Sequence, residues 1–118
     1  MKLCITAAGN DLSAQADSAF GRAPWFVLVD TDSSKVEEAV ANTSVNASNG
    51  AGIAAAQTMS DNGVDAVLTG RLGPKAQAAL AAANIGMYEG VGRVTVGEAL
   101  AQFRAGKYTL SGSAAVPP

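Results

Sequence analysis

The fold is decided by one segment, Val64-Asp65-Ala66-Val67-Leu68-Thr69-Gly70-Arg71-Leu72-Gly73-Pro74-Lys75, which combines a strand, a turn and the start of a helix. The short apolar run between Gly63 and Gly70 is typical of a strand that is buried on both faces in a parallel arrangement. Pro74 suits the first position of a helix, because it lacks the amide hydrogen that would have no partner there and its φ is already fixed. The segment therefore predicts one parallel strand leading into a helix.

The predicted helix that starts at Pro74 has a narrow apolar face. Its members follow the i, i+3, i+4, i+7 spacing that places side chains on one side of a helix: Ala76, Ala79, Leu80 and Ala83. These residues are small, so the helix is expected to pack closely against a sheet. Asn84 tolerates the left-handed conformation and is expected to end the helix.

The turn from Gly70 to Gly73 follows the carboxyl end of the predicted strand, where open α/β sheets bind ligands. The amide groups of the turn and the positive end of the helix dipole favour an anion there, and Arg71 adds a permanent positive charge. A second interpretation remains open at this point. The glycines would then only make the turn, and Arg71 would be a solvated surface charge.

Length and charge limit the class of protein. A chain of 118 residues is expected to form a single domain, here residues 1–108, followed by a flexible tail at 109–118. The net charge of −2, with Lys and Arg spread along the chain, argues against a nucleic-acid partner. No apolar run is long enough to span a bilayer and no signal peptide is recognisable, so we expect a cytoplasmic protein without a membrane partner.

Cysteine and histidine usage restricts the chemistry further. The chain has one cysteine, Cys4, and no histidine, which excludes an intramolecular disulfide and Ser-His or Cys-His nucleophilic catalysis. No catalytic constellation is recognisable, and a non-enzymatic role is expected. Cys4 is a weak candidate metal ligand, because it lies in a predicted strand and buried thiols are usually unreactive.

The remaining elements follow from local pattern. Strands are expected at Lys2–Ala8, Trp25–Asp30 and Lys35–Ala41, the last two forming a hairpin. Asp30 and Asp32 are interpreted as turn residues that bond to the backbone ahead of them, in preference to a two-carboxylate metal site. The Asn-x-Ser patterns at Asn42 and Asn46 are given no glycosylation role.

A second glycine-marked helix start follows the hairpin. The segment Asn49-Gly50-Ala51-Gly52 precedes a helix expected over Ile53–Asn62, which Gly63 ends. A short strand is expected over Ile85–Glu89. Thr95 and Glu98 then have the spacing of a capping box, so a last helix is expected from Val96 to Gly106. The order βββαβαβα predicts a three-layer α/β domain with a mixed sheet flanked by helices, in which the two glycine turns face one pocket.

The chain also resembles a known family. The matching segments lie in the family's order along nearly the whole chain: Phe20-Gly21-Arg22, Phe26–Asp30, Asn49–Gly52, Val64–Ala76, Ile85–Gly90 and Val94–Leu100. Together they resemble the dinitrogenase iron-molybdenum cofactor biosynthesis family. The resemblance implies a ribonuclease H-like α/β fold and a metal-sulfide cluster as the bound partner, with proteins of cluster assembly as further partners.

Among family members, this short, histidine-free chain resembles most those associated with a mixed molybdenum-copper sulfide cluster held without covalent attachment. Several members carry a histidine near the Gly-Ala-Gly segment, where this chain has Ser48 and Asn49. The leading hypothesis is therefore a carrier of an anionic cluster that is held by charge and backbone amides. The predicted site residues are Arg22, Asn49, Gly50, Gly52, Thr69, Gly70, Arg71, Gly73 and Lys75.

Two other functions remain as alternatives. The same glycine turns suit a phosphate- or nucleotide-binding module, although the Gly-Lys-Ser/Thr of a phosphate loop is missing. A nuclease of ribonuclease H-like fold would need several carboxylates around two metal ions. Asp30, Asp32 and Asp65 do not form an obvious set of that kind.

Overall fold

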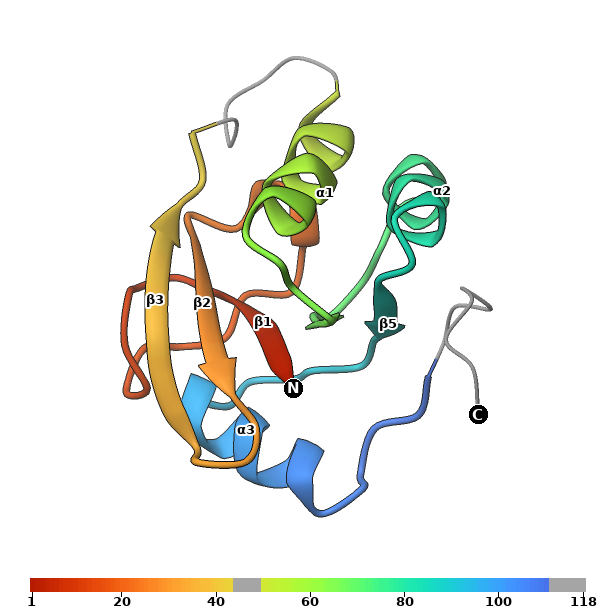
Figure 1. Ribbon diagram of the computed structural model, residues 1–118. Coiled ribbons are helices and arrows are strands. Elements are labelled where there is room, and N and C mark those ends of the chain that lie inside the picture. The colour runs from red at the N-terminus through yellow and green to blue at the C-terminus, as the bar shows by residue number, and fades with distance from the viewer. Residues whose placement is uncertain (44–49, 111–118) are drawn as a thin grey trace.

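The computed structural model describes residues 1–43 and 50–110. Strands and helices follow the predicted order βββαβαβα, with one additional turn of 3-10 helix before the second strand (Figure 1). The elements are β1 (Lys2–Ala7), η1 (Phe20–Arg22), β2 (Trp25–Asp30), β3 (Lys35–Ala41), α1 (Ala51–Asp61), β4 (Ala66–Leu68), α2 (Pro74–Ala82), β5 (Gly86–Tyr88) and α3 (Val96–Arg104).

The five strands form one mixed sheet in the order β3-β2-β1-β4-β5. β2 pairs antiparallel with both β1 and β3, whereas β1, β4 and β5 run parallel to one another. The chain enters the sheet at its centre, since β1 lies between β2 and β4. As a result, the carboxyl ends of β1, β3, β4 and β5 all lie at the same end of the sheet.

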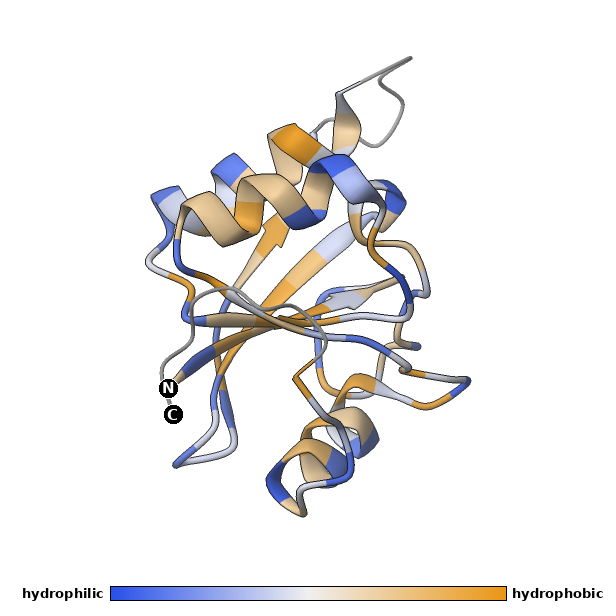
Figure 2. Cartoon of the chain, turned by 90° about the vertical axis from the view of Figure 1, so that its right-hand side faces the viewer, coloured by the Kyte–Doolittle hydropathy of each residue, from blue (hydrophilic) through white to orange (hydrophobic). Residues whose placement is uncertain are grey.

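Helices cover both faces of the sheet, as predicted. α1 and α2 pack on one face, and α3 packs on the other (Figure 2). The alternation of side chains along β1 supplies both cores: Cys4 lies in the core beneath α1 and α2, and Leu3 and Ile5 lie in the core against α3. The fold class inferred from the sequence is therefore confirmed as α/β with a mixed five-stranded sheet.

The ends of the helices use the residues that the sequence indicated. Gly63, Asn84 and Gly106 have φ angles of 66°, 60° and 77°, the left-handed conformation that ends a helix. The hydroxyl of Thr95 accepts a hydrogen bond from the Glu98 amide, and the Glu98 carboxylate accepts one from the Thr95 amide. The predicted capping box of α3 is thus confirmed.

Element boundaries differ in places from the sequence-based expectation. α1 begins at Ala51, two residues earlier than the expected Ile53, because Gly50 with φ 75° already turns the chain into the helix. Ala83, the last member of the expected apolar face of α2, is exposed, because the helix ends at Ala82. Of the expected tail at 109–118, Leu110 forms an isolated bridge with Tyr88 of β5, and residues 111–118 lie outside the described residues.

At the hairpin turn, the interpretation from sequence is confirmed for Asp30, whereas the Asp32 carboxylate lies 3.6 Å from the amino group of Met1. The Asp30 carboxylate accepts hydrogen bonds from the Asp32 amide at 3.0 Å and from the Ser33 hydroxyl at 3.1 Å. These bonds lower the pKa of Asp30, with the bond from the Asp32 amide contributing most. Asp30 is therefore a structural turn residue. Across residues 1–43 and 50–110, none of the helices combines the length and the apolar character needed to cross a membrane.

Candidate functional site

A cleft of about 430 Å³ lies where η1 and the first turns of α1 and α2 meet. We call it the arginine cleft. It is lined by Ala19, Phe20, Gly21, Arg22, Gly50, Ala51, Gly52, Arg71, Gly73, Pro74, Lys75 and Ala76. The loops that carry these residues follow β3 and β4 or precede β2, so the cleft lies at the carboxyl ends of the parallel strands. The two glycine turns that the sequence placed before helices both contribute to it.

Small residues hold the two helix starts close together. A Cβ atom built on Gly52 of α1 would lie 3.1 Å from the Cβ of Ala76 in α2, and one built on Gly21 of η1 would lie 2.9 Å from the Gly52 nitrogen. Glycine at positions 21 and 52 therefore permits a contact between η1, α1 and α2 that a larger residue would open. This contact makes one cleft from three elements that are far apart in the sequence.

The helix starts in the cleft have backbone amides that no side-chain cap satisfies. Neither Gly50 at the start of α1 nor Gly73 at the start of α2 provides a side-chain cap, whereas α3 has a full capping box. The first amides of a helix have no partner within the helix and carry the positive end of its dipole. The convergence of two such ends makes the arginine cleft favourable for an anion.

Side-chain charge in the cleft has the same sign. Arg22, Arg71 and Lys75 line it and are exposed, and the twelve lining residues include no Asp or Glu. Within residues 1–43 and 50–110, Arg71 and Lys75 form no ion pair. A chain with a net charge of −2 thus concentrates three of its eight basic residues in one cleft.

The backbone of Arg71 is held on both sides by residues at the start of η1 and just before it. Its amide donates to the Ser18 carbonyl at 2.8 Å, and its carbonyl accepts from the Phe20 amide at 3.4 Å. The next amide, that of Leu72, donates to the Glu89 carboxylate at 2.8 Å. These bonds fix the backbone from which the Arg71 side chain extends. The Arg71 and Leu72 amides, which the sequence suggested as donors to a ligand, already have partners within the protein. The free amide donors of the cleft are therefore expected at the helix starts and not in the turn.

Two predicted site residues lie away from the cleft. Thr69 is fully buried, and its hydroxyl is 2.8 Å from the Thr6 hydroxyl, which in turn donates to the Asp17 carbonyl. Gly70 packs against the chain at Ser18, where an added Cβ would lie 2.6 Å from the Ser18 oxygen. Both residues support the turn that presents Arg71. The remaining predicted site residue, Asn49, lies outside the described residues.

Several residues of the site were missed in the sequence. Phe20 and Gly21 of η1 line the cleft, and Asn42 and Glu89 support its walls through hydrogen bonds. Phe20 and Gly21 were noticed only as part of the family pattern. Nothing local indicated Asn42 or Glu89, because their partners are 21 and 17 residues away in the chain.

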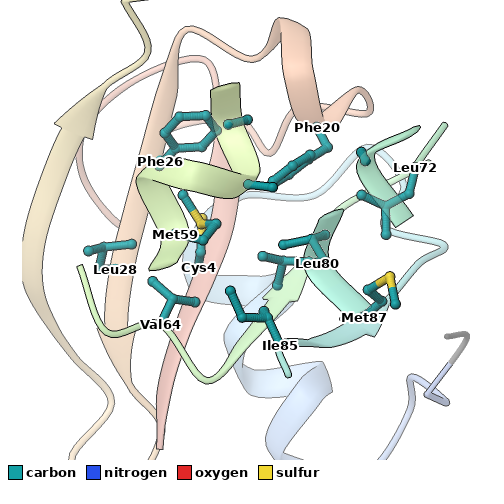
Figure 3. Close-up of a cluster of buried hydrophobic side chains, with 14 residues drawn as sticks. Cys4, Phe20, Phe26, Leu28, Met59, Val64, Leu72, Leu80, Ile85 and Met87 are labelled. Carbon is teal, nitrogen blue, oxygen red and sulfur yellow. The ribbon is translucent and has the colours of Figure 1, made fainter. Parts of the chain in front are cut away.

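Cys4 does not contribute to the cleft. It is fully buried in the core beneath α1 and α2, in the same cluster as Met59 and Phe26 (Figure 3). Burial raises the pKa of its thiol well above the ordinary value, so the sulfur stays protonated. Groups of three or more His, Cys, Asp and Glu side chains that are able to hold a metal ion do not occur within 1–43 and 50–110. The donor set of the arginine cleft therefore suits an anion bound through its outer atoms rather than a bare metal ion.

The fold and the cleft together define a small α/β protein with a positively charged cleft at the carboxyl ends of its parallel strands. Residues 1–106 match the family described as "Dinitrogenase iron-molybdenum cofactor". The chain belongs to this family.

Solved structures and a curated protein support the assignment. The apo form of the orange protein from Desulfovibrio gigas is 39% identical, with a TM-score of 0.88 over 93% of this chain and 92% of that chain. A Thermotoga protein provisionally described as NifB is 31% identical, with a TM-score of 0.79 over 92% and 91% of the two chains. An uncharacterized protein of Methanocaldococcus jannaschii is 28% identical over 109 residues, or 91% of this chain and 88% of its own length. The family resemblance inferred from the sequence is therefore confirmed, and the structure is similar to that of the orange protein.

Proposed function

We propose that this protein binds and carries an anionic metal-sulfide cluster of the molybdenum-copper type in the arginine cleft. The observation that supports this proposal most directly is the convergence of two helix starts without side-chain caps and three basic side chains on one cleft. The family, and the likeness to the orange protein, supply the class of cargo.

The geometry favours contact with the outer sulfurs of a cluster that is already assembled. Arg22, Arg71 and Lys75 would offer N–H donors and positive charge, and Pro74 would offer apolar contact. Each helix start contributes about 0.3 to 1 kcal/mol toward an anion, and each hydrogen bond to a charged group roughly 1.5 to 3 kcal/mol. Two helix starts with three or four such bonds reach the ~8 kcal/mol of micromolar binding. Binding of this strength is reversible, as a carrier requires.

The test is reconstitution without oxygen. Apo-protein is mixed with tetrathiomolybdate and a copper salt, passed through gel filtration, and examined by visible absorption and elemental analysis. We expect charge-transfer bands and both metals to elute with the wild-type protein. Replacement of both Arg71 and Lys75 by alanine should abolish retention, whereas the paired exposed surface variant Arg93→Ala with Lys107→Ala should retain it.

Two results would contradict the proposal. One is a colourless, metal-free protein after gel filtration. The other is equal retention by the cleft variant and the surface variant. In either case, calorimetric titration with phosphate and nucleotides would test the alternative of a phosphate-binding module, for which a saturable heat is expected.

A further inference from the structure

Asn42, the residue that follows β3, has a side chain that joins the end of that strand to η1. Its amide group donates to the Gly21 carbonyl at 3.1 Å and to the Ala23 carbonyl at 2.8 Å. Its backbone amide donates to the Pro24 carbonyl at 2.9 Å. The residue is 8% exposed, so these bonds are largely shielded from water.

The two carbonyls that accept from Asn42 belong to the residues on either side of Arg22. Both protons of the side-chain amide are therefore used to hold the carbonyl groups of the two residues next to this arginine. Gly21 also lies against the start of α1, where an added Cβ would meet the Gly52 nitrogen at 2.9 Å. Asn42 thus lies behind the wall of the arginine cleft that Gly21 and Arg22 form.

We infer that Asn42 is a positioning residue for the arginine cleft, which sets the place of Arg22 and Gly21 relative to the start of α1 and thereby controls affinity for an anionic sulfide cluster. This inference rests on the proposed function. Loss of the amide leaves two shielded carbonyls without their donor, and η1 then moves to find other partners. Phe20 of η1 also lies in the core beneath α1, so the stability of each variant has to be measured beside its affinity.

The experiment compares Asn42 with Asn62, which provides a matched control. The Asn62 side-chain amide also donates to a backbone carbonyl, that of Thr58, at 2.8 Å. Asn62 follows the last residue of α1. Because α1 has 11 residues, Asn62 lies roughly 16 Å from the helix start in the cleft. Each asparagine is changed to serine and to leucine. Both replacements are neutral, so a loss of affinity cannot come from added negative charge.

For each variant we would measure the dissociation constant for tetrathiomolybdate by visible titration, the visible circular dichroism of the bound probe, and the midpoint of thermal unfolding. We expect N42S and N42L to raise the dissociation constant about tenfold or more, the effect of displacing one charge-assisted contact, and to change the circular dichroism of the probe. The Asn62 variants should lower the unfolding midpoint similarly and leave both binding readouts unchanged. If N42L does not fold, N42S gives the comparison, because serine keeps a polar group beside the two carbonyls.

The outcomes separate the two hypotheses. If the wild-type protein binds tetrathiomolybdate and the Asn42 variants bind it equally tightly, the positioning role of Asn42 is wrong and the proposed function stands. Equal losses of affinity in the Asn42 and Asn62 variants would also overturn it, because the effect would then follow stability. Wild-type protein that binds no tetrathiomolybdate would overturn the proposed function and this inference with it.

Discussion

Replacement of Arg71 by alanine should weaken binding of an anionic cluster and leave the fold intact. The backbone of residue 71 is held by Ser18 and Phe20 through main-chain bonds, which alanine preserves. The side chain is exposed and forms no ion pair within the described parts of the chain. Its removal should therefore change the free energy of unfolding by no more than about 0.5 kcal/mol, as for other exposed substitutions.

The loss of affinity can be worked out from the contact that disappears. One charge-assisted hydrogen bond is worth roughly 1.5 to 3 kcal/mol, which corresponds to a rise in the dissociation constant of about 10- to 150-fold. The contribution of the two helix starts should remain. Arg71→Lys keeps the charge and loses the planar fork of donors, so an intermediate loss is expected.

The assay is visible titration of apo-protein with tetrathiomolybdate at two salt concentrations, with chemical denaturation to measure stability. Arg93→Ala is the matched control, because Arg93 is also an exposed arginine and lies outside the arginine cleft. Raising the salt concentration should weaken binding by the wild type more than binding by Arg71→Ala, because the variant lacks one of the charges that salt screens. An unchanged dissociation constant, or equal losses in Arg71→Ala and Arg93→Ala, would refute the role of Arg71.

Three further predictions concern the support of the cleft, acid stability and the thiol. Gly70→Ala should lower both stability, by about 1 to 3 kcal/mol, and affinity, because its Cβ would lie 2.6 Å from the backbone oxygen of Ser18; denaturant unfolding and titration measure the two effects. The pKa of Glu98 is lowered from 4.5 mainly by its bond from the Thr95 amide. Its contribution to stability is therefore present above that value and lost as pH falls through the lower pKa of the folded state, so Glu98→Gln should show a shallower acid loss of stability than wild type. Cys4 should react with a thiol reagent only after unfolding, and Cys4→Ala should retain binding; rapid reaction of the native protein would contradict its burial.

Local patterns were sufficient to predict the elements of the fold. The strand before Gly70, the helix start at Pro74 and the capping box of Thr95 and Glu98 each depend on neighbours within a few residues, and each is present as expected. The position where α1 begins was less certain, because a glycine with positive φ acts there in place of a side-chain cap.

The site was harder to predict than the fold, because it depends on contacts between distant segments. Arg71 and Lys75 were indicated by their place after a parallel strand, and the structure brings them beside Arg22. The supporting roles of Asn42 and Glu89 require the register of β3 and β5, which one sequence does not provide. Thr69 was predicted as a site residue, whereas its pairing with Thr6 across two parallel strands directs its side chain inward.

The basic side chains of the arginine cleft are all exposed, and this has a consequence for delivery. If a cargo binds as proposed, Arg22, Arg71 and Lys75 would contact it from the protein side and would leave its opposite side accessible. A recipient protein is then able to touch the cargo before the carrier releases it. Transfer would pass through a short-lived complex of three components, and the cluster would not have to diffuse free through water. The rate of such a transfer should depend on the concentration of the recipient, whereas release into solution would not.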